Sequence, residues 1–182
     1  PYGEVWSIAA IEERKALIAA NPALGLRWSV VESLPIHERI KLNEGNLEPL
    51  FDTYRQSMRN LAACGITTIC YNFMPVVDWC RTEREWELPN GAKAMRFDQE
   101  RFAAFDLHIL ERPEAPTEYS EEARRRARDV YSGMTQADID ILVTNIASAL
   151  PGSTTDPLTI QQFRDRLQQY RGIDSAVLRQ HL

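Results

Sequence analysis

The sequence predicts an α/β fold, and three observations support this prediction. Two apolar segments, Leu26–Glu32 and Ile66–Asn72, have the β-branched and aromatic composition of buried strands. A helical pattern precedes each of them, so the order is helix, strand, helix, strand. Two strands joined by a crossover helix are expected to be parallel, with a right-handed connection. This pattern fits both a closed barrel and an open doubly wound sheet.

The first helix is expected to begin after Ser7, whose side chain can cap it, and to run to about Ala20. Asn21–Pro22 ends it, because the residue before a proline disfavours helical backbone. Its apolar face is expected to contain Ile8, Ile11, Leu17 and Ile18. After the first strand, Ser33–Glu38 is expected to be a loop.

The second helix carries the stronger pattern. Asn46 is expected to cap it, and its apolar residues recur at spacings of three and four: Leu47, Leu50, Phe51, Tyr54, Met58 and Leu61. Gly65 stands where a left-handed residue commonly ends a helix. The second strand follows directly and ends before Pro75, which cannot donate to a sheet ladder.

After Arg81 the predicted secondary structure changes to a hairpin followed by helices. Glu85–Phe97 is expected to form a hairpin, because Asn90–Gly91 supplies the positive φ angles that tight turns need. Further helices are expected at 98–110, 120–131, 135–150 and 159–170, and from residue 174 onward, with a loop at 151–157. Asp98, Thr135 and Asp174 are expected to cap three of them. A helical block of roughly 70 residues is an insertion, since ordinary βα loops have about 2–6 residues.

Composition narrows the class of protein. Of the 182 residues, 44% are hydrophobic and 26% charged, which is ordinary for a globular protein with one core. The net charge of -5 gives no indication of a nucleic-acid or anionic membrane partner. Cys64, Cys70 and Cys80 form no CxxC pair, so the sequence favours a reducing cytoplasm over a disulfide framework or zinc ribbon. Neither a membrane-spanning apolar run nor a signal peptide is visible.

Polar side chains gather just after each predicted strand. They are Glu32, Ser33 and His37 after the first strand, and Tyr71, Asn72, Asp78, Trp79, Arg81 and Thr82 after the second. In a parallel α/β fold, the carboxyl ends of the strands share the face where ligands bind. Carboxylates and an imidazole there can bind a metal, transfer protons or hold sugar hydroxyls.

Structural roles compete with these functional ones. His37 fits a solvated loop as well as a site, and Asp78 can pair with Arg81. Cys70, inside a strand, is expected to be a small buried hydrophobic residue, and nothing in the sequence identifies a base for Cys80. The sequence has no glycine-rich phosphate loop, His-Glu-x-x-His or Gly-x-Ser-x-Gly motif.

Several strings of unusual composition occur along nearly the whole chain. They are Gly3–Trp6, Trp28–Glu38, Cys70–Trp79, Arg81–Thr82, Glu87–Gly91, Arg96–Asp98, Phe102–Phe105 and Thr144–Ile146. In this order they resemble the mannonate dehydratase family. The resemblance implies a TIM-type (β/α)8 barrel related to the xylose isomerase group. It also implies dehydration of D-mannonate to 2-keto-3-deoxy-D-gluconate in hexuronate (glucuronate) catabolism.

The family resemblance further implies a hydro-lyase that depends on a divalent metal, Mn²⁺ or Fe²⁺. A metal would stabilise the charge that develops when the poorly acidic proton beside a carboxylate is removed. The family's metal ligands, two His, one Cys and one Asp, lie on later strands. None of the cysteines or histidines of this chain matches one of them, so the ligands are expected outside this chain.

On this interpretation the chain is one incomplete domain of a longer protein. Residues 1–80 would form a partial barrel with the second and third strands, 81–172 the hairpin and helical insertion, and 173–182 the start of the next barrel helix. The chain alone is expected to be inactive. It is also expected to aggregate or stay partly unfolded, because two barrel strands leave both sheet edges unpaired.

By position, the resemblance implies a set of substrate-binding residues: Glu32, His37, Tyr71, Asn72, Asp78 and Arg81. They are expected to hold sugar hydroxyls or to orient a metal ligand, while the catalytic acid and base are not identified. Two alternatives fit the same chain: a sugar isomerase or epimerase on the same barrel, and a non-catalytic helical interaction module. The insertion could build homo-oligomer contacts or a lid, and the sequence does not decide between them.

Overall fold

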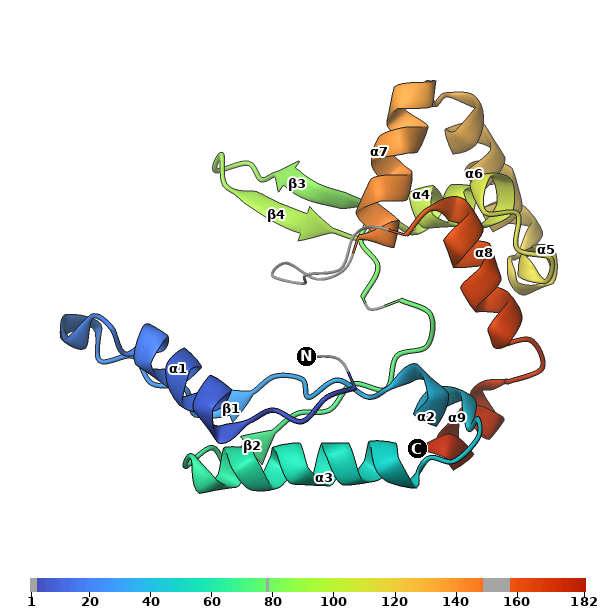
Figure 1. The fold of residues 1–182 in the computed structure, drawn as a ribbon. Coiled ribbons are helices and arrows are strands. Elements are labelled where there is room, and N and C mark those ends of the chain that lie inside the picture. Colours follow the sequence, from blue (N-terminus) through green and yellow to red (C-terminus); the bar gives the residue numbers. More distant parts are fainter. Residues whose placement is uncertain (1–2, 78, 149–157) are drawn as a thin grey trace. The chain divides into compact units, whose positions relative to one another are not determined.

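The computed structural model describes residues 3–77, 79–148 and 158–182, and the chain divides into two compact units (Figure 1). Unit 1 contains Pro1–Pro75 and Gly172–Leu182, and unit 2 contains Val76–Arg171. Two expectations, the loop at 151–157 and the role of Asp78, fall outside the described residues. Within those residues, no helix has the length and apolar character needed to cross a bilayer.

Unit 1 contains the predicted parallel strand pair. Strand β1 (Val30–Val31) pairs with β2 (Thr68–Ile69), with Val30 opposite Thr68. The parallel direction is confirmed, but each strand is far shorter than its predicted segment. The strands are short because a ladder extends only where two backbones lie side by side. Within the described residues, no third strand joins this pair. The structure is therefore mixed helix and strand and does not form a closed barrel.

Two helices cover one face of this strand pair, α1 (Ile8–Ile18) and α3 (Glu48–Ala63) (Figure 1). The core beneath them consists of Ile11, Val31, Leu61, Cys64 and Ile66. Ser7 caps α1 as predicted, accepting from Ala10 N at 3.2 Å. The predicted apolar face of α1 is confirmed only in part: Ile11 is buried and Ile18 half-buried, but Ile8 and Leu17 are 50% and 60% exposed. Only a narrow strip around Ile11 meets the core.

Helix α3 is held at both ends. It begins one residue later than predicted, with Leu47 as the N-cap residue, while the Asn46 side chain accepts from Glu48 N at 3.2 Å. At its other end, Lys15 Nζ of α1 donates to Cys64 O at 2.7 Å. Gly65 follows with a φ of +81°, the left-handed geometry expected there.

Three short elements complete unit 1: η1 (Pro22–Leu24), α2 (Glu38–Leu42) and α9 (Ser175–His181). The sequence did not predict α2, because five residues are too few to show a helical period. Helix α9 packs on α2, and His181 Nδ1 lies 2.8 Å from Lys41 O. Asp174 caps α9 as predicted, accepting from Ala176 N and Val177 N.

Unit 2 begins with the predicted hairpin. Strands β3 (Glu83–Glu87) and β4 (Lys93–Arg96) are antiparallel, and Gly91 in the turn has a φ of +80°. The Arg96 guanidinium lies over the Trp86 ring, 4.1 Å from its centre. Helices follow at α4 (Gln99–Ala104), the π-helical η2 (Phe105–Ile109), α5 (Ala115–Glu118), α6 (Glu121–Ser132), α7 (Gln136–Ala147) and α8 (Ile160–Gln169).

Unit 2 has its own apolar core, and side chains cap the N-termini of several of its helices. The core joins η2, α7 and α8 through Phe105, Leu110, Leu142, Ile146, Ala147 and Phe163. Asp98 and Thr135 cap their helices as predicted, and Ser120 and Thr159 also act as caps; Thr135 and Thr159 do so within capping boxes. A π-helical turn continues α4 where the sequence predicts one regular helix to Leu110.

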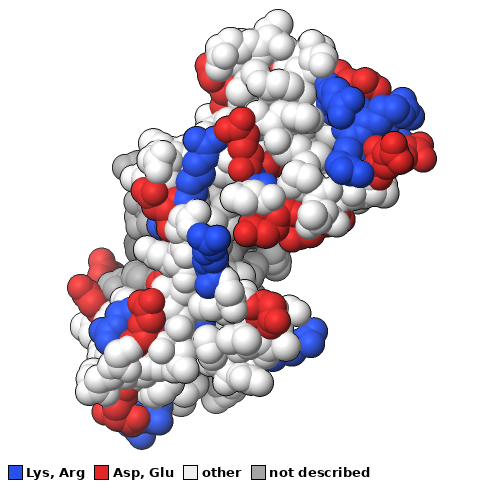
Figure 2. Space-filling model, turned by 90° about the vertical axis from the view of Figure 1, so that its right-hand side faces the viewer, with Lys and Arg blue, Asp and Glu red and all other residues white. Residues whose placement is uncertain are grey.

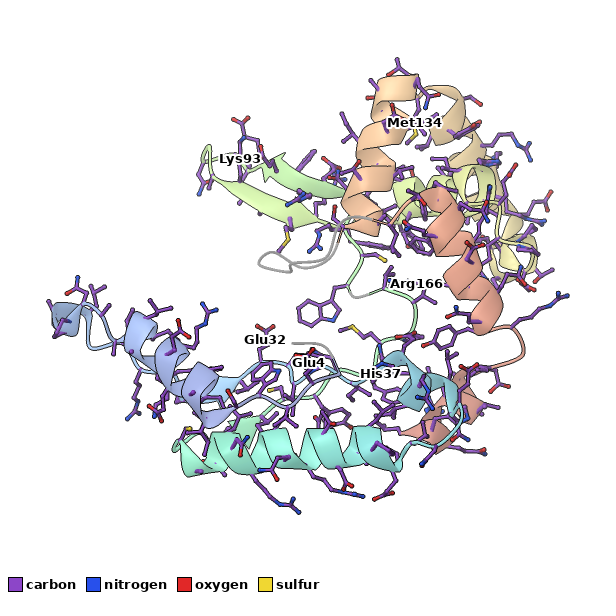
Figure 3. All side chains as sticks on the ribbon, in the orientation of Figure 1. Glu4, Glu32, His37, Lys93, Met134 and Arg166 are labelled. Carbon is purple, nitrogen blue, oxygen red and sulfur yellow. The ribbon has the colours of Figure 1, made fainter. Side chains whose placement is uncertain are left out.

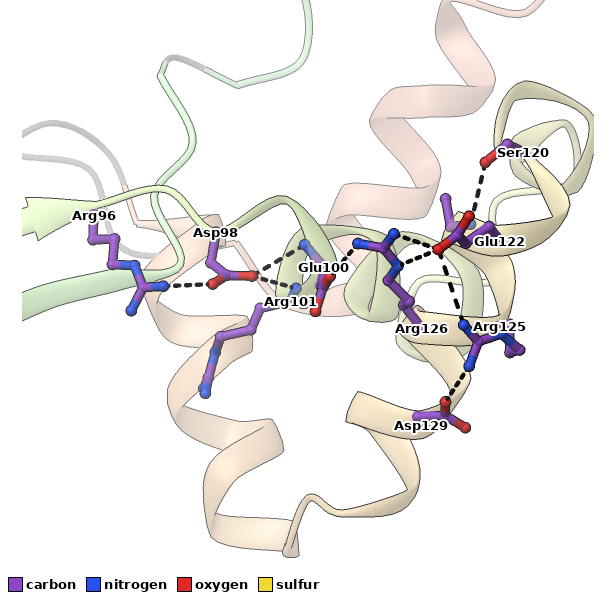
Figure 4. Close-up of polar contacts among 10 residues, drawn as sticks. Arg96, Asp98, Glu100, Arg101, Ser120, Glu122, Arg125, Arg126 and Asp129 are labelled. Carbon is purple, nitrogen blue, oxygen red and sulfur yellow. Dashed lines mark hydrogen bonds and ion pairs between the residues drawn. The ribbon is translucent and has the colours of Figure 1, made fainter.

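The exposed surface of unit 2 carries charges of both signs. Arg126 of α6 lies 3.1 Å from Glu100 of α4 and also pairs with Glu122, and Arg125 lies 3.5 Å from Asp129 (Figure 4). In the face drawn in Figure 2, basic and acidic side chains are interspersed rather than collected in one basic patch. Such pairs at a solvated surface contribute little to stability.

Candidate functional site

The strand pair of unit 1 brings the residues after both strands to the same edge. Val31 lies opposite Ile69, and Cys70 N donates to Val31 O at 2.9 Å, so the two chains leave the pair side by side. Val31 is buried under the helices, whereas Val30 and Glu32 are exposed. Alternation along a strand therefore directs Glu32 away from α1 and α3. Figure 3 shows Glu4, Glu32 and His37 on the side of the strand pair opposite α3.

His37 is the N-cap residue of α2. Its Nδ1 atom accepts from Arg39 N at 3.2 Å, so in the neutral ring the proton is on Nε2. The half-buried imidazole lines a small pocket with side chains from the N-terminal segment and from α3. His37 is therefore an oriented side chain rather than one on a solvated loop.

The N-terminal segment forms one wall of this pocket. Trp6 N donates to Ser57 Oγ at 3.0 Å, and Asn60 Nδ2 donates to Trp6 O at 2.8 Å, which joins the segment to α3. Glu4 lies in this segment, lines the pocket and is exposed. Sequence reasoning missed Glu4, because it precedes the first helix and follows no described strand.

Tyr71 and Asn72 follow β2. Tyr71 is 57% exposed and Asn72 is half-buried. The Tyr71 phenol lies near Tyr54 of the pocket wall, and the pKa of Tyr54 is raised by burial and secondarily by Tyr71. Just beyond, Lys41 Nζ of α2 donates to Met74 O at 2.9 Å and pairs with Glu38 at 3.0 Å. This lysine fixes the backbone that follows Asn72.

Arg81 belongs to unit 2, not to the cluster in unit 1. Its side chain is buried, with Nη2 donating to Ser148 O at 3.1 Å and Nη1 lying 3.5 Å from Met95 Sδ. The adjacent Thr82 is also buried, and Asn145 Nδ2 donates to Thr82 O at 2.9 Å. These contacts join the hairpin to the end of α7.

Other residues named from the sequence differ in exposure. Cys70 is exposed, so its prediction as a buried hydrophobic residue is wrong. Cys70 follows Ile69, which packs on the core, so alternation directs its side chain to the uncovered face. Cys80 packs against the core of unit 2, where burial raises the pKa of its thiol. Trp79 is exposed.

The described residues do not fit a metal centre. Among residues 3–77, 79–148 and 158–182, no three His, Cys, Asp or Glu side chains are grouped so that they could hold an ion. Structural and catalytic metal sites usually need three or four such ligands. The polar residues that follow the two strands, Glu32, Tyr71 and Asn72, and the pocket residue His37 all carry hydrogen-bonding groups.

The chain is similar to one known protein family along its whole length. The family model described as D-mannonate dehydratase (UxuA) matches residues 1–182. The mannonate dehydratases of Marinomonas sp. (strain MWYL1) and Brucella canis (strain ATCC 23365 / NCTC 10854 / RM-666) are each 52% identical to this chain, over 182 and 184 residues. Each alignment covers 100% of this chain and 46% of the relative, so the chain spans about half the length of these relatives.

A solved structure agrees with these matches. The mannonate dehydratase of Streptococcus suis serotype 2 is 30% identical, with a TM-score of 0.51, covering 80% of this chain and 39% of that one. The sequence matches extend across the strand pair, the hairpin and the helices of unit 2 alike. This chain belongs to the D-mannonate dehydratase family.

Proposed function

We propose that the complete protein to which this chain belongs dehydrates D-mannonate to 2-keto-3-deoxy-D-gluconate. The observation that carries the proposal is 52% identity to mannonate dehydratases along all 182 residues. In this elimination a proton leaves C2, beside the carboxylate, and hydroxide leaves C3. The resulting enol becomes the C2 ketone, so the products are the keto acid and one water molecule.

Within that reaction, the four polar side chains of unit 1 bind the sugar acid. Glu32 can accept from a hydroxyl, while the amide of Asn72, the phenol of Tyr71 and His37 can donate or accept. Glu32, Tyr71 and Asn72 are supported by their position just after the paired strands β1 and β2, and His37 by its oriented place in the neighbouring pocket. A substrate role for Asp78 or Arg81 stays a prediction, and the buried contacts of Arg81 already give it a structural role.

The proposal extends to a metal, an environment and an assembly. The complete protein would take Mn²⁺ or Fe²⁺ on residues outside this chain, in a reducing cytoplasm. The complete protein would also form a homo-oligomer. Metal content by elemental analysis and molar mass by light scattering would test the first and the last of these.

The decisive experiment is an assay of the full-length protein. D-mannonate is incubated with the enzyme and Mn²⁺, and in parallel with a chelator, and the product is identified by mass spectrometry. We expect a 2-keto-3-deoxy acid that has lost one water, formed only when metal is present. A product of unchanged mass would instead identify a sugar isomerase or epimerase, and no product would exclude the proposal.

A further inference from the structure

The N-terminal segment lies directly against the imidazole of His37. Gly3 has a φ of +72°, and a Cβ atom added there would lie 3.0 Å from His37 Cδ2 and 3.6 Å from Nε2. A contact of 3.0 Å is too close for a carbon side chain without movement of the ring. The absence of a side chain at position 3 thus permits this approach.

The opposite edge of the same ring is also held. His37 Nδ1 accepts from Arg39 N at 3.2 Å, in the first turn of α2. The imidazole therefore has one edge on the helix start and the other against the backbone of Gly3. The segment that carries Gly3 is itself fixed, because Ser57 and Asn60 of α3 bind the backbone of Trp6.

We propose that Gly3 is a positioning residue that sets the orientation of the His37 imidazole toward the substrate. This inference rests on the proposed function, in which His37 binds the sugar acid. A side chain at position 3 would turn the ring and move Nε2, which faces Gly3 rather than the helix. The ring must give by a few tenths of an ångström to admit this Cβ, and active-site groups must be held to within about 0.5 Å.

The chain offers a matched control for this test. Gly25 also has a positive φ, +59°, but a Cβ added there meets nothing within 4 Å. Gly3→Ala and Gly25→Ala therefore impose similar backbone strain, and only the first meets the imidazole. In the full-length enzyme we expect Gly3→Ala to lower kcat/KM for D-mannonate at least tenfold and Gly25→Ala to leave it unchanged. Equal effects of the two substitutions would overturn the proposal.

A double-mutant cycle separates positioning from simple loss of folding. His37→Asn keeps a capping side chain for α2 and removes the ring that faces Gly3. We expect Gly3→Ala to have no further effect in that background, because the group it displaces is gone. If Gly3→Ala were equally harmful with and without the imidazole, Gly3 would act through something else.

A direct readout keeps the test independent of the reaction. The imidazole NMR signals of His37, assigned by their loss in His37→Asn, should shift in Gly3→Ala and stay in place in Gly25→Ala. If the wild-type enzyme produced no keto acid, the proposed function would fail while these spectra still reported on the contact. Unchanged His37 signals in Gly3→Ala would overturn the inference even in an active enzyme.

Discussion

The buried polar side chains of unit 2 differ from the polar side chains that follow the strands of unit 1. In unit 2, Arg81, Thr82, Asp106 and Asn145 are buried and bonded to other groups of the protein. In unit 1, the side chains of Glu32, Tyr71 and Asn72 make no hydrogen bond or ion pair within the described part of the chain. These side chains lie at the carboxyl end of a strand pair, where α/β enzymes bind ligands. The buried polar groups of unit 2 therefore bond within the fold, whereas these three side chains of unit 1 form no such bonds among the described residues.

The strongest polar cluster of unit 2 centres on a buried carboxylate. Arg112 Nη2 donates to Asp106 Oδ2 and to Glu118 Oε2, both at 2.8 Å, and Tyr119 OH donates to Asp106 Oδ2 at 3.1 Å. Arg112 lowers the pKa of Glu118 through these bonds. Burial, followed by the charge of Asp106, raises the pKa of Tyr119. The four side chains close the turn between η2 and α6.

The largest expected effect comes from removing the cation of this cluster. Arg112→Met leaves the buried Asp106 carboxylate without its cation and with the Tyr119 hydroxyl as a remaining donor, and we expect this to destabilise unit 2 by about 3–5 kcal/mol. Native-state hydrogen exchange of α6 amides would measure the loss. Arg125→Met is the control, because Arg125 forms only solvated pairs with Glu122 and Asp129, and it should cause no measurable change. Equal losses in the two variants would remove the distinction between buried and surface pairs.

A second substitution tests how much the apolar core contributes to the stability of unit 2. Leu142 of α7 is fully buried, whereas its neighbour Ile141 is 57% exposed. We expect Leu142→Ala to cost about 2–5 kcal/mol through lost contacts and a residual cavity. Ile141→Ala should stay within about 0.5 kcal/mol. Exchange of α7 amides would measure both, and a similar cost at the two positions would show that this face of α7 is misassigned.

The difference between local and long-range contacts explains which features could be predicted from the sequence. Helix caps and the hairpin turn follow from neighbouring residues, so Asp98, Thr135 and Asn90–Gly91 were predicted correctly. Strand length was not, because it depends on which backbone lies alongside. Burial of Arg81 depends on Ser148, which is 67 residues away in sequence. Such long-range pairings leave no local pattern.

The residues of the candidate site also differ in whether their position could be predicted from the sequence. Glu32, Tyr71 and Asn72 follow the paired strands directly, so their shared edge could be predicted from the rule for parallel sheets. Glu4 could not, because only the folded N-terminal segment brings it beside His37 in the pocket. A sequence motif containing Gly3 and Glu4 was part of the family resemblance, but the glycine gave no indication of its contact.

Unit 1 should show the reverse response, losing activity without losing stability. Asn72→Ala removes a group that we propose binds the sugar acid. Loss of a hydrogen bond to a charged or polar ligand should lower kcat/KM about tenfold to a hundredfold. Stability should change by no more than about 0.5 kcal/mol, because the Asn72 side chain is only half-buried and forms no hydrogen bond among the described residues. Glu13→Ala, at an exposed position of α1, is the control for activity.

An opposite outcome for Asn72 would favour a different class of protein. If Asn72→Ala and His37→Asn both left the activity of the full-length protein intact, the polar edge would be dispensable. The helical interaction module would then gain support over the enzyme. Loss of activity together with a large fall in stability would instead show that Asn72 has a structural role like the buried groups of unit 2.

The smallest expected effect concerns a half-buried imidazole in unit 2, that of His108. The His108 ring stacks on Tyr131 with centres 5.1 Å apart, and its Nε2 is buried with no hydrogen-bond partner among the described residues. Burial lowers the pKa of His108, and the positive charge of Arg128 adds to this. The unfolded chain therefore takes up the proton first as the pH falls. Stability is lost below the unfolded pKa of about 6.5, down through the folded value.

His108→Phe should keep the stack on Tyr131 and remove the group that titrates. We expect unit 2 of this variant to gain about 1 kcal/mol, because a buried nitrogen without a partner is lost. Its stability should also depend less on pH below about 6.5. Hydrogen-exchange protection of α6, corrected for intrinsic exchange and compared on either side of that pH, would measure both effects. The same pH dependence in the variant and the wild type would mean that His108 stays neutral, or becomes charged, equally in the folded and unfolded chains. Burial of the His108 ring would then make no contribution to the pH dependence of the stability of unit 2.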